Sequence, residues 1–239
     1  MAEEEARSSL VLGVLGGMGP AATLEFLAKL QAFTPAKRDQ DHIRVLMDLN
    51  PKVPDRNVPG SGAGAVLAEM AGALAGAGAE VLAMPCNTAH AHADLIQRAS
   101  GLPLIDLIAT GATAARDLGA RRVGVIGTKG ALRLYREYLA AQAMGLVTLE
   151  PERQEEFMAT IYKIKSGDLG PAVQREMAGY AADLIAGGAE AVIAGCTEAP
   201  LVLGSQAGRI PMIDPGELLA RRCVAVCLGR EPVPAMPTI

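Results

Sequence analysis

The sequence predicts an α/β protein made of two structurally repeated domains, each a parallel sheet flanked by helices, related by a pseudo-two-fold axis. Two observations predict this fold. Apolar, β-branched runs alternate with helical patterns rich in Ala, Leu and Glu, as in parallel α/β layers. In addition, three motifs recur in the same order in the second part of the chain. The alternation predicts parallel sheets covered by helices, and the recurrence of the motifs predicts two repeated domains.

Short apolar runs bounded by turn residues predict the strands of both sheets. They cover residues 10–15, 43–49, 81–84, 104–105, 123–126, 146–149, 191–194 and 211–213. Helical patterns lie between most of them, which places helices on the faces of each sheet. No predicted strand follows the last helical pattern, 215–228, so we expect that helix to cross back and pack on the first domain.

The repeat is visible in three pairs of segments. "LGVLGGMG" corresponds to "VGVIGTKG", "EVLAMPCNTA" to "EAVIAGCTEA", and "LPLID" to "IPMID". The equivalent glycines, cysteines and aspartates lie 111, 110 and 108 residues apart. This near-constant offset predicts a first domain over 1–108, onto which 215–239 packs back, and a second domain over 109–214.

Composition argues against several classes of partner. A net charge of -4 and 3% aromatic residues suit neither a nucleic-acid phosphate backbone nor an anionic membrane. The start, MAEEEARSS, is acidic where a secretory signal would be basic, and no apolar stretch of membrane-spanning length occurs. We therefore expect a cytoplasmic protein. The four cysteines lack metal-type spacing and should be thiols in a reducing cytosol.

Two of those cysteines, Cys86 and Cys196, each end an apolar strand and precede a helix. Ligands bind at the carboxyl ends of parallel strands, so both thiols should face one cleft from opposite sides. That arrangement suits inversion of a carbon centre, in which one thiol removes a proton and the other supplies one. We expect the helix N-termini to lower the pKa of both thiols. Cys223 and Cys227 lie four residues apart on a late helix and are predicted to be structural.

The motifs "LGGMGPAAT", "NPKVPDR", "MPCNTAH", "IYKIKSG" and "AGCTEAPL" together resemble those of the aspartate/glutamate racemase family, the cofactor-independent amino-acid racemases. The resemblance implies an active site between two domains, no pyridoxal phosphate and no metal, and an acid/base pair of Cys86 and Cys196. It implies that Arg56 binds the side-chain carboxylate of an amino-acid substrate, assisted by Lys165. Relatives are commonly dimers, which implies a homodimer. Further substrate-binding residues are expected to be Met18, Asn87, Thr88, Thr128, Thr197 and Glu198.

Other interpretations remain open at this point. Gly17-x-Gly19-x-x-Ala22, with Asp48 as the acid, fits the dinucleotide template weakly, and His90 with His92 is a weak metal pattern. Maleate-type isomerases, arylmalonate-type decarboxylases and hydantoin racemases share the sequence plan, and a non-catalytic amino-acid-binding module would also suit two lobes. After PDR the chain reads "NVPGSGAG", a departure from the family pattern that leaves the preferred side chain open.

Overall fold

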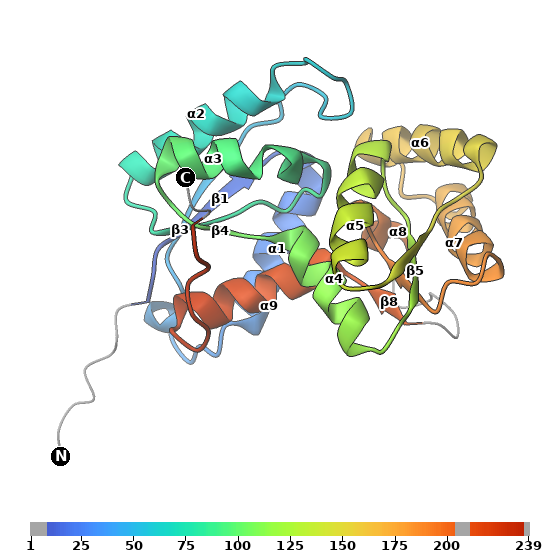
Figure 1. Cartoon of the computed structure of the whole chain (residues 1–239). Coiled ribbons are helices and arrows are strands. Elements are labelled where there is room, and N and C mark those ends of the chain that lie inside the picture. The colour runs from blue at the N-terminus through green and yellow to red at the C-terminus, as the bar shows by residue number, and fades with distance from the viewer. Residues whose placement is uncertain (1–8, 204–210, 237–239) are drawn as a thin grey trace.

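The computed structural model describes residues 9–203 and 211–236, and within these ranges it confirms the predicted fold class (Figure 1). Two four-stranded, fully parallel sheets are present, with strand orders β2-β1-β3-β4 and β6-β5-β7-β8. Every predicted apolar run overlaps a strand. The strands are β1 (Leu12–Gly16), β2 (Val45–Leu49), β3 (Val81–Ala83), β4 (Leu104–Ile105), β5 (Arg122–Val125), β6 (Gly145–Val147), β7 (Ala191–Ile193) and β8 (Met212–Ile213).

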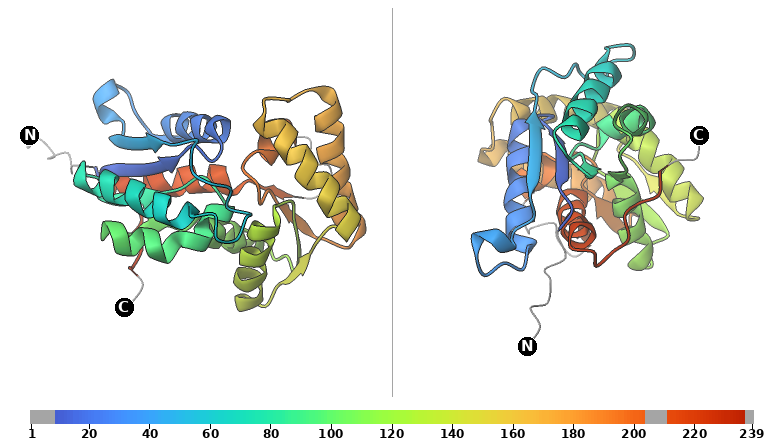
Figure 2. Two further views of the ribbon diagram at one scale, coloured as in Figure 1. Left: turned by 90° about the horizontal axis from the view of Figure 1, so that it is seen from above. Right: turned by 90° about the vertical axis from the view of Figure 1, so that its left-hand side faces the viewer.

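Helices cover both faces of each sheet, as the alternating pattern predicted (Figures 1 and 2). On the first sheet, one face packs against α1 and α9 and the other against α2 and α3. On the second sheet, one face packs against α4 and α5 and the other against α6 and α7. The helices are α1 (Pro20–Phe33), α2 (Ala63–Gly76), α3 (Ala93–Ser100), α4 (Leu107–Asp117), α5 (Lys129–Ala141), α6 (Pro151–Lys165), α7 (Pro171–Ala186), α8 (Ala199–Leu203) and α9 (Pro215–Cys227), with 3₁₀ turns η1 (Asp39–Asp41) and η2 (Thr88–His92).

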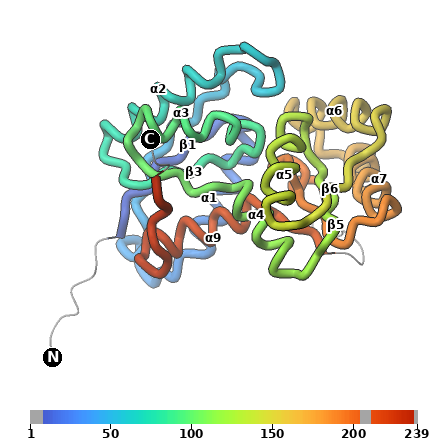
Figure 3. Tube along the Cα trace, viewed as in Figure 1, coloured from blue at the N-terminus to red at the C-terminus, as the bar shows by residue number. Residues whose placement is uncertain are grey.

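Helices α4 and α9 each pack on the opposite half from the strand that precedes them. Helix α4 follows the last strand of the first sheet and packs on α5, β7 and β8, whereas α9 follows the last strand of the second sheet and packs on α1, β3 and β4. The two helices also contact each other where the halves meet (Figure 3). One hydrophobic cluster therefore runs from the α1/α9 face to the α4/α5 face. This equivalence of α4 with α9 is what a pseudo-two-fold axis requires.

Two equivalent aspartates tie α4 and α9 in place. Asp106 caps the N-terminus of α4, and its Oδ2 accepts a hydrogen bond from the Tyr138 hydroxyl of α5 at 2.5 Å. Asp214 caps α9 in the same way, and its Oδ2 pairs with the Lys29 ammonium of α1 at 2.6 Å. Each aspartate thus stabilises the start of a helix and binds it to the half that the helix covers. No helix in the described ranges is both long enough and apolar enough to cross a bilayer.

Candidate active site

A small cavity with about 20 Å³ of free space, here called the thiol cavity, lies where β3 of one half and β7 of the other half end. Both predicted cysteines line it. The other predicted site residues line the same cavity, and Asn57 and Gly195 are additional lining residues that sequence reasoning missed although each directly adjoins a predicted one. The predicted set is Met18, Arg56, Cys86, Asn87, Thr88, Thr128, Lys165, Cys196, Thr197 and Glu198.

The turn after β3 holds Cys86 through a buried imidazole. His90 Nδ1 lies 2.9 Å from the Cys86 carbonyl oxygen, and its Nε2 accepts the backbone N–H of Leu107 at 3.2 Å. Because Nε2 is an acceptor, Nδ1 carries the proton and donates to the carbonyl. Both ring nitrogens are therefore used in fixing the turn against the start of α4. Among the described residues, no group of three or more His, Cys, Asp or Glu side chains is arranged to hold a metal ion.

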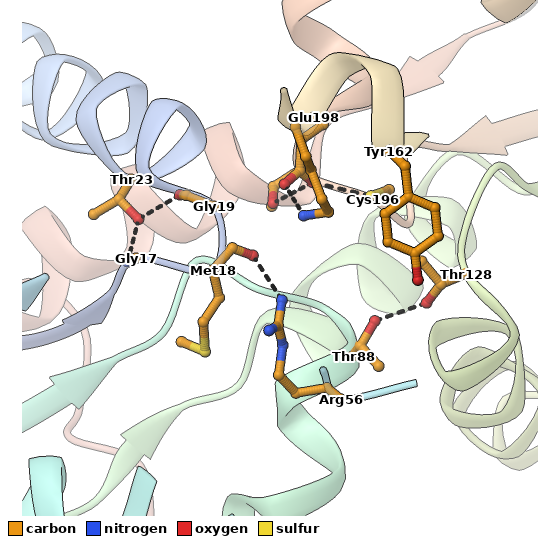
Figure 4. Close-up of polar contacts among 12 residues, drawn as sticks. Gly17, Met18, Gly19, Thr23, Arg56, Thr88, Thr128, Tyr162, Cys196 and Glu198 are labelled. Carbon is orange, nitrogen blue, oxygen red and sulfur yellow. Dashed lines mark hydrogen bonds and ion pairs between the residues drawn. The ribbon is translucent and has the colours of Figure 1, made fainter. Parts of the chain in front are cut away.

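Asn87 presents an unpaired donor at the thiol cavity. Its Oδ1 accepts a hydrogen bond from the fully buried Tyr135 hydroxyl of α5 at 2.8 Å. Its Nδ2 is buried and has no partner among the described residues. A buried N–H without an acceptor costs free energy, so this amide is a group that gains from a ligand oxygen. The adjacent Thr88 hydroxyl bonds that of Thr128 at 2.7 Å and joins the two halves beside the cavity (Figure 4).

Cys196 lies against a carboxylate. Its Sγ donates to Glu198 Oε2 at 3.0 Å, and the other carboxylate oxygen, Oε1, forms an ion pair with the Lys165 ammonium from the end of α6. Glu198 is only 3% exposed. Burial, and then the Glu198 charge, raise the pKa of the Cys196 thiol well above its usual range, although Lys165 opposes this. The expectation that a helix N-terminus lowers this pKa is wrong, because burial of the sulfur and the Glu198 charge outweigh the backbone N–H of Glu198, which favours the thiolate.

The Lys165 ammonium is electrostatically coupled to both cysteines. Burial lowers its pKa, but the Glu198 carboxylate and then the charges of Cys196 and Cys86 outweigh burial, and the pKa is raised. Lys165 therefore remains a cation inside the thiol cavity. A cation near two thiols stabilises a thiolate on either side of the cavity.

Arg56 lies at the edge of the thiol cavity and is held by backbone oxygens. One terminal nitrogen contacts the carbonyls of Val53 and Pro54 at 3.4 and 3.2 Å, and the other contacts the Met18 carbonyl at 3.4 Å (Figure 4). Its buried Nε has no partner, and the guanidinium forms no ion pair within the described residues. A guanidinium without a carboxylate partner is a ready site for a ligand carboxylate.

The glycines of the GGMGP turn bring the first half close to the second. Gly17 has φ +94°, and a Cβ there would lie 2.4 Å from the Asn50 carbonyl carbon. A Cβ at Gly19 would lie 3.1 Å from Glu198 Oε1. The Thr23 hydroxyl fixes the turn by accepting the Gly17 N–H at 3.0 Å and donating to the Gly19 carbonyl at 2.9 Å (Figure 4). A left-handed backbone packed against Asn50 explains Gly17, and close approach to Glu198 explains Gly19, without a dinucleotide.

The environments of the two cysteines differ although their positions in the repeat are equivalent. The segments CNTA and CTEA align Thr88 with Glu198. Thr88 forms a neutral hydroxyl pair, whereas Glu198 carries the charge that faces Cys196. The site is therefore symmetric in backbone and asymmetric in charge.

The chain is similar to amino-acid racemases of known sequence and structure. A glutamate racemase of Synechococcus sp. (strain CC9605) is 32% identical over 180 residues, which span 72% of this chain but only 65% of that protein. The broad specificity amino-acid racemase RacX of Bacillus subtilis is 25% identical over 92% of this chain and all of its own length. The structure of Picrophilus torridus aspartate racemase is 25% identical and superposes with a TM-score of 0.77 over 92% of this chain and 94% of that chain. The family model described as Asp/Glu/Hydantoin racemase matches residues 15–223, and the chain belongs to that family.

Proposed function

We propose that this protein interconverts the L- and D-enantiomers of an acidic amino acid, aspartate or glutamate, by two-base proton transfer between Cys86 and Cys196. One observation carries the proposal. The two cysteines end equivalent strands, β3 and β7, of a repeated fold, and both line one small cavity between the halves. Removing a proton from one face of a carbon and supplying one to the other face requires two such groups on opposite walls.

The charges around the thiol cavity support an acidic substrate. Arg56 and Lys165 are cations that line the cavity, and Arg56 has no carboxylate partner among the described residues. An Arg fork binds a carboxylate with two parallel hydrogen bonds, and Lys adds a compact charge. The free Asn87 amide is a donor for the second carboxylate, the one attached to the reacting carbon. The same donor stabilises negative charge as the Cα proton leaves.

Glu198 sets the starting protonation of the pair. Because its carboxylate accepts the Cys196 S–H, Cys196 begins as the thiol, which is the acid. In the direction that starts from this state Cys86 is the base, which requires its thiolate form: it removes the Cα proton, while Cys196 delivers its own proton to the opposite face of the planar carbanion. The product leaves Cys86 as a thiol and Cys196 as a thiolate, which is the state that accepts the opposite enantiomer. No proton is gained or lost by the protein and substrate together, and exchange with water restores the starting state.

The experiment is to incubate the protein with L-aspartate and with L-glutamate in deuterated water, following loss of the Cα–H signal by NMR and enantiomer ratio by chiral chromatography. We expect both exchange and racemisation with at least one of them. Cys86→Ser and Cys196→Ser should each lower racemisation by about 10²–10⁴-fold, the usual worth of a positioned acid or base. Cys223→Ser, in α9 and outside the thiol cavity, is the matched control. Full racemisation in either single variant contradicts the two-base assignment, and no exchange with any amino acid tested favours a binding module.

A second candidate is racemisation of a wider range of amino acids. The match to the broad specificity racemase RacX covers that protein's whole length, which favours this candidate. The loop 57–64, which departs from the family pattern, also borders Arg56. Initial rates over a panel of acidic, neutral and basic amino acids separate the two candidates.

A further inference from the structure

A second cavity, here called the basic cavity, lies beside the thiol cavity, and among the described residues the two share only Arg56 and Asn57. It holds about 550 Å³ of free space, compared with about 20 Å³ for the thiol cavity. The first half contributes loop residues 57–62, the start of α2, the end of η2 and Leu95 of α3, and the second half contributes the start of α5. The basic cavity therefore lies between the halves and is large enough for a ligand of its own.

The described side chains that line the basic cavity carry positive charge and no negative charge. Arg56, Lys129 and Arg133 line it together with His92, and no Asp or Glu of the described ranges is among the lining residues. Lys129 is paired with the exposed Glu155, but Arg133 forms no ion pair within residues 9–203 and 211–236. Burial, and then the Arg133 charge, lower the pKa of His92, so this imidazole is neutral at neutral pH. The positive charge of the basic cavity therefore comes from Arg56, Lys129 and Arg133.

Backbone donors add to the side-chain charges. The glycine-rich loop leads into α2, whose N-cap, Gly62, has φ +84° and supplies no side-chain cap. The first N–H groups of that helix, those of Ala63 and Gly64, have no acceptor among the described residues. On the opposite wall α5 begins at Lys129, and Gly130 also lines the basic cavity. The N-termini of two long helices, α2 and α5, therefore border the basic cavity, and the positive end of a helix dipole favours an anion.

We propose that the basic cavity binds an anion in addition to the substrate of the thiol cavity, and that its ligand is phosphate or a small phosphate monoester. A doubly charged group with several acceptor oxygens matches Lys129, Arg133 and the loop N–H groups better than a single carboxylate does, and Arg56 lies at the border that the two cavities share. The remaining wall is apolar, with Val58, Ala91 and Leu95, and would take the organic part of a monoester. Because the lining residues come from both halves, the bound anion would bridge them.

The test is calorimetric titration of the full chain with inorganic phosphate at constant ionic strength, together with its melting temperature as phosphate increases. We expect saturable binding and a rise in melting temperature. Arg133→Gln should weaken phosphate binding about tenfold or more, because it removes one charge-assisted contact. Arg136→Gln, the same change on an exposed position of α5 outside the basic cavity, should bind phosphate like the unmodified protein.

Two more variants keep the test decisive. Ala91→Glu places a carboxylate on an exposed position of the basic cavity and should abolish phosphate binding, whereas Lys165→Gln changes only the thiol cavity and should leave it unchanged. Phenyl phosphate distinguishes the two sources: tighter binding than phosphate indicates a monoester, and equal binding indicates free phosphate. The proposal is overturned by no saturable binding, by equal effects of Arg133→Gln and Arg136→Gln, or by loss of binding in Lys165→Gln alone.

Discussion

Removal of the Tyr135 hydroxyl tests how the second half orients a donor in the first. The hydroxyl donates to Asn87 Oδ1 at 2.8 Å, and both residues are buried. In Tyr135→Phe the ring remains, but Asn87 Oδ1 loses the one partner it has among the described residues. An unsatisfied buried acceptor costs about 1–3 kcal/mol, so we expect the free energy of unfolding in urea to fall by about that amount.

The same change should weaken substrate binding. Asn87 Nδ2 is the free donor at the thiol cavity, and it is aimed by the bond that Tyr135 makes on the other side of the amide. If poorer orientation of the amide costs about 1 kcal/mol of substrate-binding free energy, KM rises about fivefold, since 1.4 kcal/mol corresponds to a tenfold change. Initial racemisation rates with the preferred L-amino acid measure it.

Tyr180→Phe is the matched control. Its hydroxyl is also buried, and it bonds Thr160 Oγ1 at 3.0 Å between α6 and α7, outside the thiol cavity. Thr160 keeps contacts to Glu156 and Glu176, so the stability loss should lie near about 1 kcal/mol. KM should not change. Equal KM values in the two Tyr→Phe variants would refute the orienting role of Tyr135.

Three other predictions concern the thiol, the GGMGP turn and the link between the halves. Iodoacetamide should modify Cys196 slowly at neutral pH and faster as pH rises, because burial and the Glu198 carboxylate raise the pKa of the thiol. Glu198→Gln should shift the pH dependence of this modification, followed by mass spectrometry, to lower pH. An unchanged pH dependence would contradict the role of the carboxylate. Gly60→Ala should lower the free energy of unfolding by about 1 kcal/mol, because it strains a left-handed backbone. Gly17→Ala should lower it further, because its Cβ would also collide with the backbone of Asn50. Urea unfolding of the two variants measures the difference. Lys29→Met should lower stability by about 1 kcal/mol. Burial lowers the pKa of Lys29, but its ion pairs with Asp214 and Glu25 outweigh burial and raise that pKa above 10.5. The stabilisation from these ion pairs is therefore present below pH 10.5 and is lost as pH rises through the folded-state pKa.

The strands and the repeat were predictable because their signals are local. A parallel strand is a short apolar run, and equivalent motifs carry equivalent strand ends, which is why Cys86 and Cys196 were placed together from the sequence. The contact of Tyr135 with Asn87 was not predictable, because it joins residues 48 apart through the docking of α5 on the first half. No periodicity in the sequence reports how two halves dock.

The error about Cys196 has a similar origin. A helix N-terminus is visible in the sequence, but the burial of the sulfur and the side-chain direction of Glu198 are not. The basic cavity was missed for the same reason. Its cations stand far apart in the chain, at Arg56 and at Arg133, and only the packing of α5 beside loop 57–64 brings them together.

The unequal surroundings of the two sulfurs have a consequence for the proposed reaction. Mirror-image amino acids have equal free energy in water, so the equilibrium constant is one and kcat/KM must be the same in both directions. Glu198 on one wall and Thr88 on the other make proton transfer unequal in the two directions. Turnover at saturation can then differ between L- and D-substrate only if the Michaelis constants differ by the same ratio. The charge asymmetry therefore sets which enantiomer is consumed faster at high concentration, while the reaction still ends at a 1:1 mixture.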